Sequence, residues 1–139
     1  MKKLVFDTSA LLAYIENESG ASIVENMLLK ATECKVEIFI SVVSLIELFY
    51  ITVQEQSEKI ALKRIELTKV LPIHVVGLEE TDTETVAMLK AKYRISFADS
   101  CIAGLAKIKN AELVHKDPEY ETLPIKQKKL PYNKVIPKS

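Results

Sequence analysis

The chain has 139 residues, which suits one domain that buries most of the surface its unfolded form exposes. Its 19 basic and 19 acidic residues cancel, so the sequence lacks the positive charge of proteins that hold nucleic acid mainly by counterion release. The two cysteines are too far apart for a Cys-x-x-Cys motif, so neither a zinc site nor a redox motif is indicated. The apolar run near the N-terminus is too short for a signal peptide or a membrane span, and we expect a cytoplasmic protein.

The first half of the chain alternates between strand-like and helical patterns. The apolar run at 4–6 predicts a buried strand, and the Asp-Thr-Ser that follows it predicts a helix N-terminus. Apolar spacing then predicts helices at 9–16 and about 21–34, a strand at 38–40, and helices at about 45–56 and 58–70.

The second half continues the alternation. After Pro72 the pattern predicts a strand at 73–76, a helix from 81 to about 94, a helix from about 98, and a strand at 112–115. Strands that alternate with helices indicate an α/β fold with a parallel, doubly wound sheet and helices on both faces.

The C-terminal segment is rich in lysine. From Lys126 onward it holds five lysines and no acid. We expect residues 1–122 to form the domain and residues 123–139 to form a basic tail, because Pro131 and Pro137 oppose a regular element there. A solvated, poorly ordered terminus is favoured over an arm that binds nucleic acid.

Four acidic residues fall at the ends of predicted elements. Asp7 and Asp117 follow strands, whereas Glu47 and Asp99 lie near helix N-termini. In such folds ligands bind outside the carboxyl ends of the strands, so the four side chains can converge. Carboxylates without His or Cys partners favour Mg²⁺ or Mn²⁺ over Zn²⁺. Paired ions of this kind hydrolyse phosphodiesters by activating water and stabilising the leaving oxygen.

Each acid also has a local explanation. Glu47 fits a capping box that begins at Ser44, Asp99 suits the dipole of a helix N-terminus, and Asp117 suits a turn before a proline. Asp7 has the weakest local explanation, although it can cap the helix that follows. On spacing alone, a metal site and these structural roles are equally supported.

Four segments together resemble the motifs of PIN-domain nucleases, and those of VapC-like toxins in particular. They are Val5-Phe6-Asp7-Thr8-Ser9-Ala10-Leu11, Ser44-Leu-Ile-Glu47, Phe97-Ala-Asp99-Ser-Cys-Ile-Ala103 and Leu113-Val-His-Lys-Asp117. The resemblance covers the chain from about Leu4 to Glu121. It implies a three-layer α/β/α fold around a central parallel sheet, and ribonuclease activity that depends on Mg²⁺ or Mn²⁺.

The resemblance also assigns roles to individual residues. Asp7, Glu47 and Asp99 match the three principal acids of the family, which bind metal and activate water. Asp117 matches a fourth, more variable acid, and Ser9 matches a hydroxyl position beside the first. One departure is His115, which stands where the family commonly has Thr or Ser two residues before the fourth acid; a structural role is the more common one for such a histidine.

Partners are implied as well. VapC-like proteins form homodimers and bind an antitoxin peptide through helices that correspond to the first and third helices here. Those helices carry Tyr14, Leu48, Phe49 and Tyr50, most of which we expect in the core. An exposed remainder would indicate a partner surface.

An acidic pocket needs cations around it to hold RNA. The candidates for RNA binding are Lys90, Lys92 and Arg94, just before the Asp99 motif. Cations at the end of a helix also complement its dipole. RNA binding and this structural role are equally supported.

We therefore expect a metal-dependent endoribonuclease, the toxin of a toxin-antitoxin pair. The alternatives are a free-standing RNA-processing nuclease of the same type and an inactive PIN-like scaffold that binds RNA or protein. A haloacid-dehalogenase-type phosphatase is disfavoured, because its second acid would stand at position 9, where this chain has Ser9.

Overall fold

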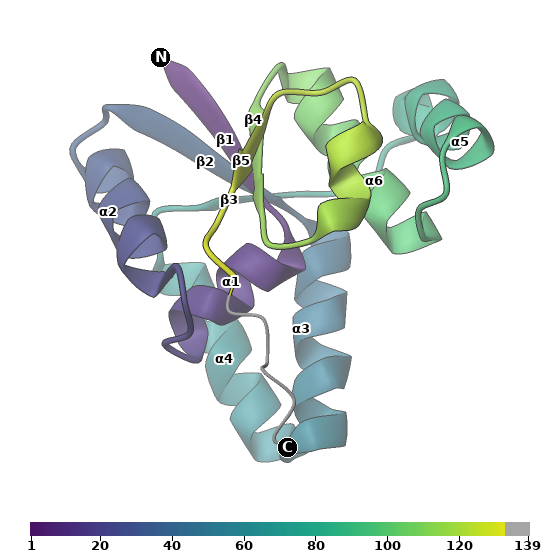
Figure 1. The fold of residues 1–139 in the computed structure, drawn as a ribbon. Coiled ribbons are helices and arrows are strands. Elements are labelled where there is room, and N and C mark those ends of the chain that lie inside the picture. Colours follow the sequence, from purple (N-terminus) through teal and green to yellow (C-terminus); the bar gives the residue numbers. More distant parts are fainter. Residues whose placement is uncertain (133–139) are drawn as a thin grey trace, which may run out of the picture.

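The structure is a computed structural model that describes residues 1–132. It contains one parallel sheet of five strands in the order β3-β2-β1-β4-β5, with helices packed on both faces (Figure 1). This arrangement confirms the predicted α/β class with three layers and a central parallel sheet. Within the described residues no helix is long and apolar enough to cross a membrane.

The elements follow the alternation expected from the sequence. The strands are β1 (Lys2–Phe6), β2 (Val36–Ser41), β3 (His74–Val76), β4 (Glu112–His115) and β5 (Gln127–Lys129). The helices are α1 (Thr8–Ile15), α2 (Ala21–Thr32), α3 (Val42–Glu55), α4 (Glu58–Val70), α5 (Thr83–Lys92) and α6 (Phe97–Lys109). Two short 3₁₀ helices, η1 (Glu80–Asp82) and η2 (Pro118–Thr122), precede α5 and β5.

Successive residues of the central strands face opposite layers of helices. In β1, Val5 packs into the cluster that contains residues of α5 and α6. Its neighbours Leu4 and Phe6 pack into the cluster that contains residues of α1, α2 and α3. Both clusters are buried, as the two-sided burial of a parallel sheet requires. The apolar run that predicted β1 therefore supplies both halves of the core.

The N-terminus of α3 differs from the prediction. The helix begins at Val42, and the Ser41 side chain caps it by accepting the N–H of Val43 at 3.1 Å. The predicted capping box from Ser44 to Glu47 is therefore wrong, because both residues already lie inside the helix. The first residues of α3 are Val42 and Val43, and β-branched residues have low helix propensity. The sequence pattern therefore did not indicate that the helix begins there.

The C-terminal segment differs from the predicted tail. Residues 127–129 form β5, which pairs in parallel with β4, and the next residue, Leu130, is buried. Gln127 is half-buried, whereas Lys128 and Lys129 are exposed. A short, charged edge strand gives no apolar alternation, so the sequence offered no strand signal there. Lys134, Pro137 and Lys138 of the predicted tail lie outside the described residues.

Candidate functional site

Asp7 lies directly after β1 and begins α1. Its Oδ1 accepts the N–H of Ala10 at 2.8 Å, so the carboxylate caps the helix as expected. The Ser9 hydroxyl lies 2.7 Å from Oδ1 and 2.8 Å from Oδ2 of the same carboxylate. Only 4% of Asp7 is exposed, and burial is the main reason why its pKa rises to about 7. Asp7 is thus a buried N-cap of α1 whose pKa lies well above its ordinary value.

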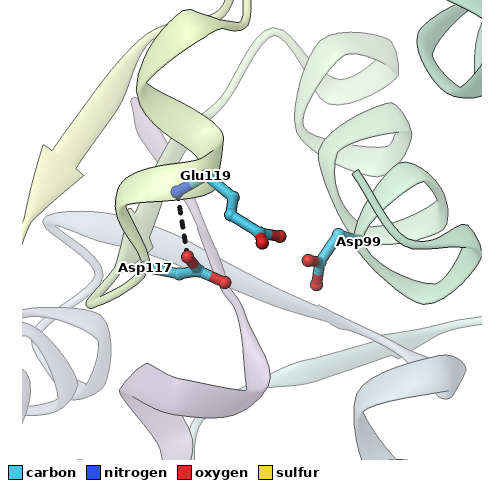
Figure 2. A group of neighbouring side chains, drawn as sticks. All are labelled: Asp99, Asp117 and Glu119. Atoms are coloured by element: carbon cyan, nitrogen blue, oxygen red, sulfur yellow. Dashed lines mark hydrogen bonds between the residues drawn. The ribbon is translucent and has the colours of Figure 1, made fainter. Parts of the chain in front are cut away.

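Three other carboxylates gather close to one another. Asp99, Asp117 and Glu119 each offer one oxygen, and these oxygens lie within 4.8 Å of one another (Figure 2). Asp99 comes from the first turn of α6, and Glu119 comes from η2. Asp117 caps η2, and its Oδ1 accepts the N–H of Glu119 at 2.9 Å. The fold thus brings together two of the four predicted acids and adds Glu119, which the sequence did not single out.

Asp7 is coupled electrostatically to this group. The negative charges of Asp99 and Asp117 both raise the pKa of Asp7, after the larger effect of burial. Burial also raises the pKa of Asp99, and the neighbouring charge of Asp117 acts in the same direction. Like charges held together in a partly buried place favour a bound cation.

Glu47 stands apart from the group of three. It lies in the second turn of α3, and the Thr8 hydroxyl donates to its Oε1 at 2.6 Å. The Tyr50 hydroxyl donates to Oε2 at 3.3 Å. Thr8 directly follows Asp7, so one hydrogen bond ties Glu47 to the end of β1. Among the described residues, the set of carboxylates within 4.8 Å includes neither Glu47 nor Asp7.

Tyr120 reaches the acids from η2. Its side chain is buried, and its hydroxyl donates to Asp99 Oδ1 at 2.8 Å. Burial, with the charges of Asp7 and Asp99, holds the pKa of Tyr120 far above its usual range, so the phenol keeps its proton. Sequence reasoning missed this residue, because nothing in local spacing shows that η2 folds over the first turn of α6.

The predicted RNA-binding cations are all exposed. Lys90 and Lys92 lie in the last turn of α5, and Arg94 lies in the segment before α6. Within residues 1–132 none of the three forms an ion pair. Their charges are therefore available to a ligand, although two of them also complement the dipole of α5.

The donor set fits a hard divalent cation. The clustered side chains offer only carboxylate oxygens, and Asp7 and Glu47 add two more carboxylates nearby. Mg²⁺ and Mn²⁺ prefer such oxygen ligands, whereas zinc sites usually include His or Cys. Asp99, Asp117 and Glu119 can thus hold such an ion, and Asp7 and Glu47 are two further candidate acids outside that group.

Comparisons with known proteins agree with this fold. The family model described as PIN domain matches residues 4–126. No curated protein sequence matches the chain.

Solved structures with the same fold come from several bacteria. A VapBC2 structure from Rickettsia felis, bound to a DNA fragment from its promoter, has a TM-score of 0.77 at 18% identity and covers 93% of this chain and 99% of that chain. A DNA-bound VapBC from Salmonella typhimurium has a TM-score of 0.77 at 21% identity and covers 93% of this chain and 98% of that chain. VapC20 from Mycobacterium tuberculosis is described as a toxin that cleaves the sarcin-ricin loop. Its structure has a TM-score of 0.68 at 12% identity and covers 88% of this chain and 95% of that chain.

Proposed function

Because this chain belongs to the PIN domain family, we propose that it is a Mg²⁺- or Mn²⁺-dependent endoribonuclease and the toxin of a toxin-antitoxin pair. The observation that carries the proposal is the gathering of Asp99, Asp117 and Glu119 beside the buried Asp7. Such a gathering of acids costs stability unless a cation neutralises it, and this cost supports a functional reason for it.

The chain's own residues would hold the ion and orient the reaction. Asp7, Glu47, Asp99 and Asp117 are its proposed ligands, and Glu119 is an additional one. Ser9 fixes the Asp7 carboxylate, whereas Thr8 fixes that of Glu47. When bound, the metal would supply an activated water and positive charge for the developing phosphate charge. None of these side chains needs to act as a nucleophile, which suits hydrolysis.

RNA is the proposed substrate. The acids repel phosphates, so binding requires cations around the site. Lys90, Lys92 and Arg94 are exposed, free of acidic partners within residues 1–132, and close in sequence to Asp99. We assign to these three side chains the binding of the phosphates that flank the scissile bond. The similar M. tuberculosis protein is described as a toxin that cleaves the sarcin-ricin loop, which supports this substrate class.

An antitoxin and a second copy of the chain are the proposed protein partners. The R. felis and S. typhimurium relatives are described as VapBC complexes, which supports an antitoxin partner. Of the apolar residues expected in the core, Leu48 is fully buried, whereas Tyr50 is 44% exposed. Tyr50 shares a helix face with Ile46, which is 57% exposed, and we assign this face to a homodimer.

Cleavage of labelled single-stranded RNA tests the enzymatic proposal. Wild-type protein is compared in Mn²⁺, in Mg²⁺ and in chelator, beside Asp7→Asn and Asp99→Asn variants whose folding is verified. Glu25→Gln, an exposed change on α2, is the matched control. We expect cleavage that needs metal, is retained in the control, and is lost in both aspartate variants.

Other outcomes point to the alternatives. An inactive wild type that still binds RNA or antitoxin would favour a PIN-like scaffold without catalysis. Cleavage by a protein that binds no antitoxin encoded beside it would favour a free-standing RNA-processing nuclease.

A further inference from the structure

The side chain of Tyr120 contacts the candidate acids through its hydroxyl. Its ring is buried in the cluster formed with α5 and α6, and only the hydroxyl reaches the site, at 2.8 Å from Asp99 Oδ1. A phenol is protonated at neutral pH, so it donates to the carboxylate. Phenylalanine would fill the same space, and the hydroxyl is therefore the part of Tyr120 that packing does not explain.

The backbone of Tyr120 is held by β5. The Gln127 side-chain amide donates to the Tyr120 carbonyl at 2.7 Å and to the Leu123 carbonyl at 3.3 Å. These two bonds fix the orientation of the amide, because only its nitrogen can donate. The Gln127 oxygen must then face the other way, toward His115 Nε2 at 2.9 Å.

His115 connects the same network to Asp117. Its ring is fully buried, and Nδ1 accepts the backbone N–H of Asp117 at 3.1 Å. Since Nδ1 accepts, the ring proton of the neutral imidazole is on Nε2, where the Gln127 oxygen receives it. The His115 ring also packs against the Tyr120 ring, with centroids 4.9 Å apart. The side chains of Tyr120, His115 and Gln127 thus belong to one network. It contacts Asp99 through the Tyr120 hydroxyl and the backbone of Asp117 through the His115 ring.

We propose that Tyr120 is a positioning residue for metal binding, whose hydroxyl holds one oxygen of Asp99 so that the other is oriented for the ion. His115 and Gln127 fix the positions of Tyr120 and Asp117 relative to each other. The inference rests on the proposed function, because it presumes that Asp99 and Asp117 bind the ion. It gives His115 a structural task in place of the Thr or Ser expected at its position.

Tyr120→Phe tests the role of the hydroxyl while keeping the ring. Mn²⁺ affinity is measured by titration with electron paramagnetic resonance of the free ion, without RNA. Partners that orient metal ligands typically contribute 10-fold or more to affinity, so we expect roughly 10-fold weaker Mn²⁺ binding. At low Mn²⁺ the cleavage rate falls, and at saturating Mn²⁺ it recovers, with the KM for RNA unchanged throughout.

Tyr93→Phe is the matched control. Tyr93 is half-buried and packs against the same cluster, but within residues 1–132 its hydroxyl makes no hydrogen bond to a carboxylate. We expect wild-type Mn²⁺ affinity in this variant. If Tyr120→Phe also binds Mn²⁺ like the wild type, the inference is overturned and the proposed function stands. If the wild type binds no Mn²⁺, the proposed function fails and the inference fails with it.

Two changes at His115 test the network without altering Tyr120. Asparagine can offer an oxygen to the Asp117 N–H in place of Nδ1, whereas leucine cannot. We expect Mn²⁺ affinity close to wild type in His115→Asn and clearly reduced affinity in His115→Leu. Equal affinity in the two variants would overturn the positioning role of the network, even if Tyr120→Phe does not fold.

Discussion

The Ser9 hydroxyl lies within hydrogen-bond distance of both carboxylate oxygens of Asp7, and it also accepts the backbone N–H of Lys116 at 3.0 Å. A hydroxyl has one proton, and Ser9 directs it to Asp7, since Lys116 occupies a lone pair. The contact joins the start of α1 to the segment after β4, so Ser9 connects the two strand ends that carry Asp7 and Asp117.

Replacement of Ser9 by alanine should shift the pH dependence of metal binding upward. The Ser9 hydrogen bond lowers the pKa of Asp7 and opposes the burial that raises it to about 7. Without that bond the carboxylate ionises at higher pH, and a metal ligand must be ionised to bind. Mn²⁺ titrations from pH 6 to pH 9 should show half-maximal affinity at higher pH in Ser9→Ala. Ser22→Ala, on the exposed surface of α2, is the control, and coincident profiles would contradict the role of Ser9.

The raised pKa of Asp7 also predicts how stability depends on pH in chelator. Between the ordinary value of 3.8 and about 7, the unfolded chain has lost the proton that the folded chain retains. The contribution of the protonated Asp7 carboxyl to the free energy of unfolding is therefore fully present below pH 3.8. It is lost as the pH rises toward 7, by on the order of 4 kcal/mol at most. Asp7→Asn has no such charge and keeps an acceptor for the Ala10 N–H.

Denaturant unfolding with chelator should accordingly find Asp7→Asn more stable than wild type at pH 8, with a smaller difference at pH 4.5. Adding Mn²⁺ at pH 8 should stabilise the wild type and not the variant, because a ligand stabilises only the state that binds it. A variant less stable than wild type at pH 8 would contradict the electrostatic cost of Asp7.

The sequence was informative where local pattern and tertiary position coincide. The apolar run of β1 and the Asp7 that follows it were predicted together, because a buried strand and a helix cap both leave local signals. The strand β5 left none, because it is defined by pairing with β4 rather than by apolar residues of its own. Tyr120 and Glu119 were missed for the same reason, since their approach to Asp99 depends on how η2 folds over α6.

Glu47 shows the converse case, in which a local pattern misled. Its spacing from Ser44 matched a capping box, yet the helix begins two residues before Ser44, at Val42, and Ser41 is its cap. The Glu47 side chain instead accepts from Thr8, which lies 39 positions away in sequence. A long-range contact of this kind leaves no signal in local spacing, and the role of Glu47 as a metal ligand stays a prediction from the motif resemblance.

Reversing the charges at Lys92 and Arg94 should weaken RNA binding. Both side chains are exposed, with Lys92 in the last turn of α5 and Arg94 in the segment before α6. Each phosphate contact contributes to the salt dependence of affinity, so the double variant should bind more weakly and with a slope reduced by about 2. Binding of uncleavable RNA from 50 to 300 mM salt measures this slope. Reversal of Lys59 and Lys63 on α4 is the matched control, and equal losses in both variants would indicate only a general effect of net charge.

Exposed apolar residues on α3 predict that the protein associates with itself. Ile46, Tyr50 and Val53 are 57%, 44% and 39% exposed, and their spacing places them on one face of the helix. Sedimentation of the protein without antitoxin should show a homodimer, and Ile46→Glu should shift it toward monomer, because a charge in an apolar interface is costly unless paired. Leu62→Glu, a similarly exposed change on α4, should leave the dimer intact. A wild type that sediments as a monomer at high concentration would contradict the dimer, and a dimer that withstands Ile46→Glu would place the interface on another face.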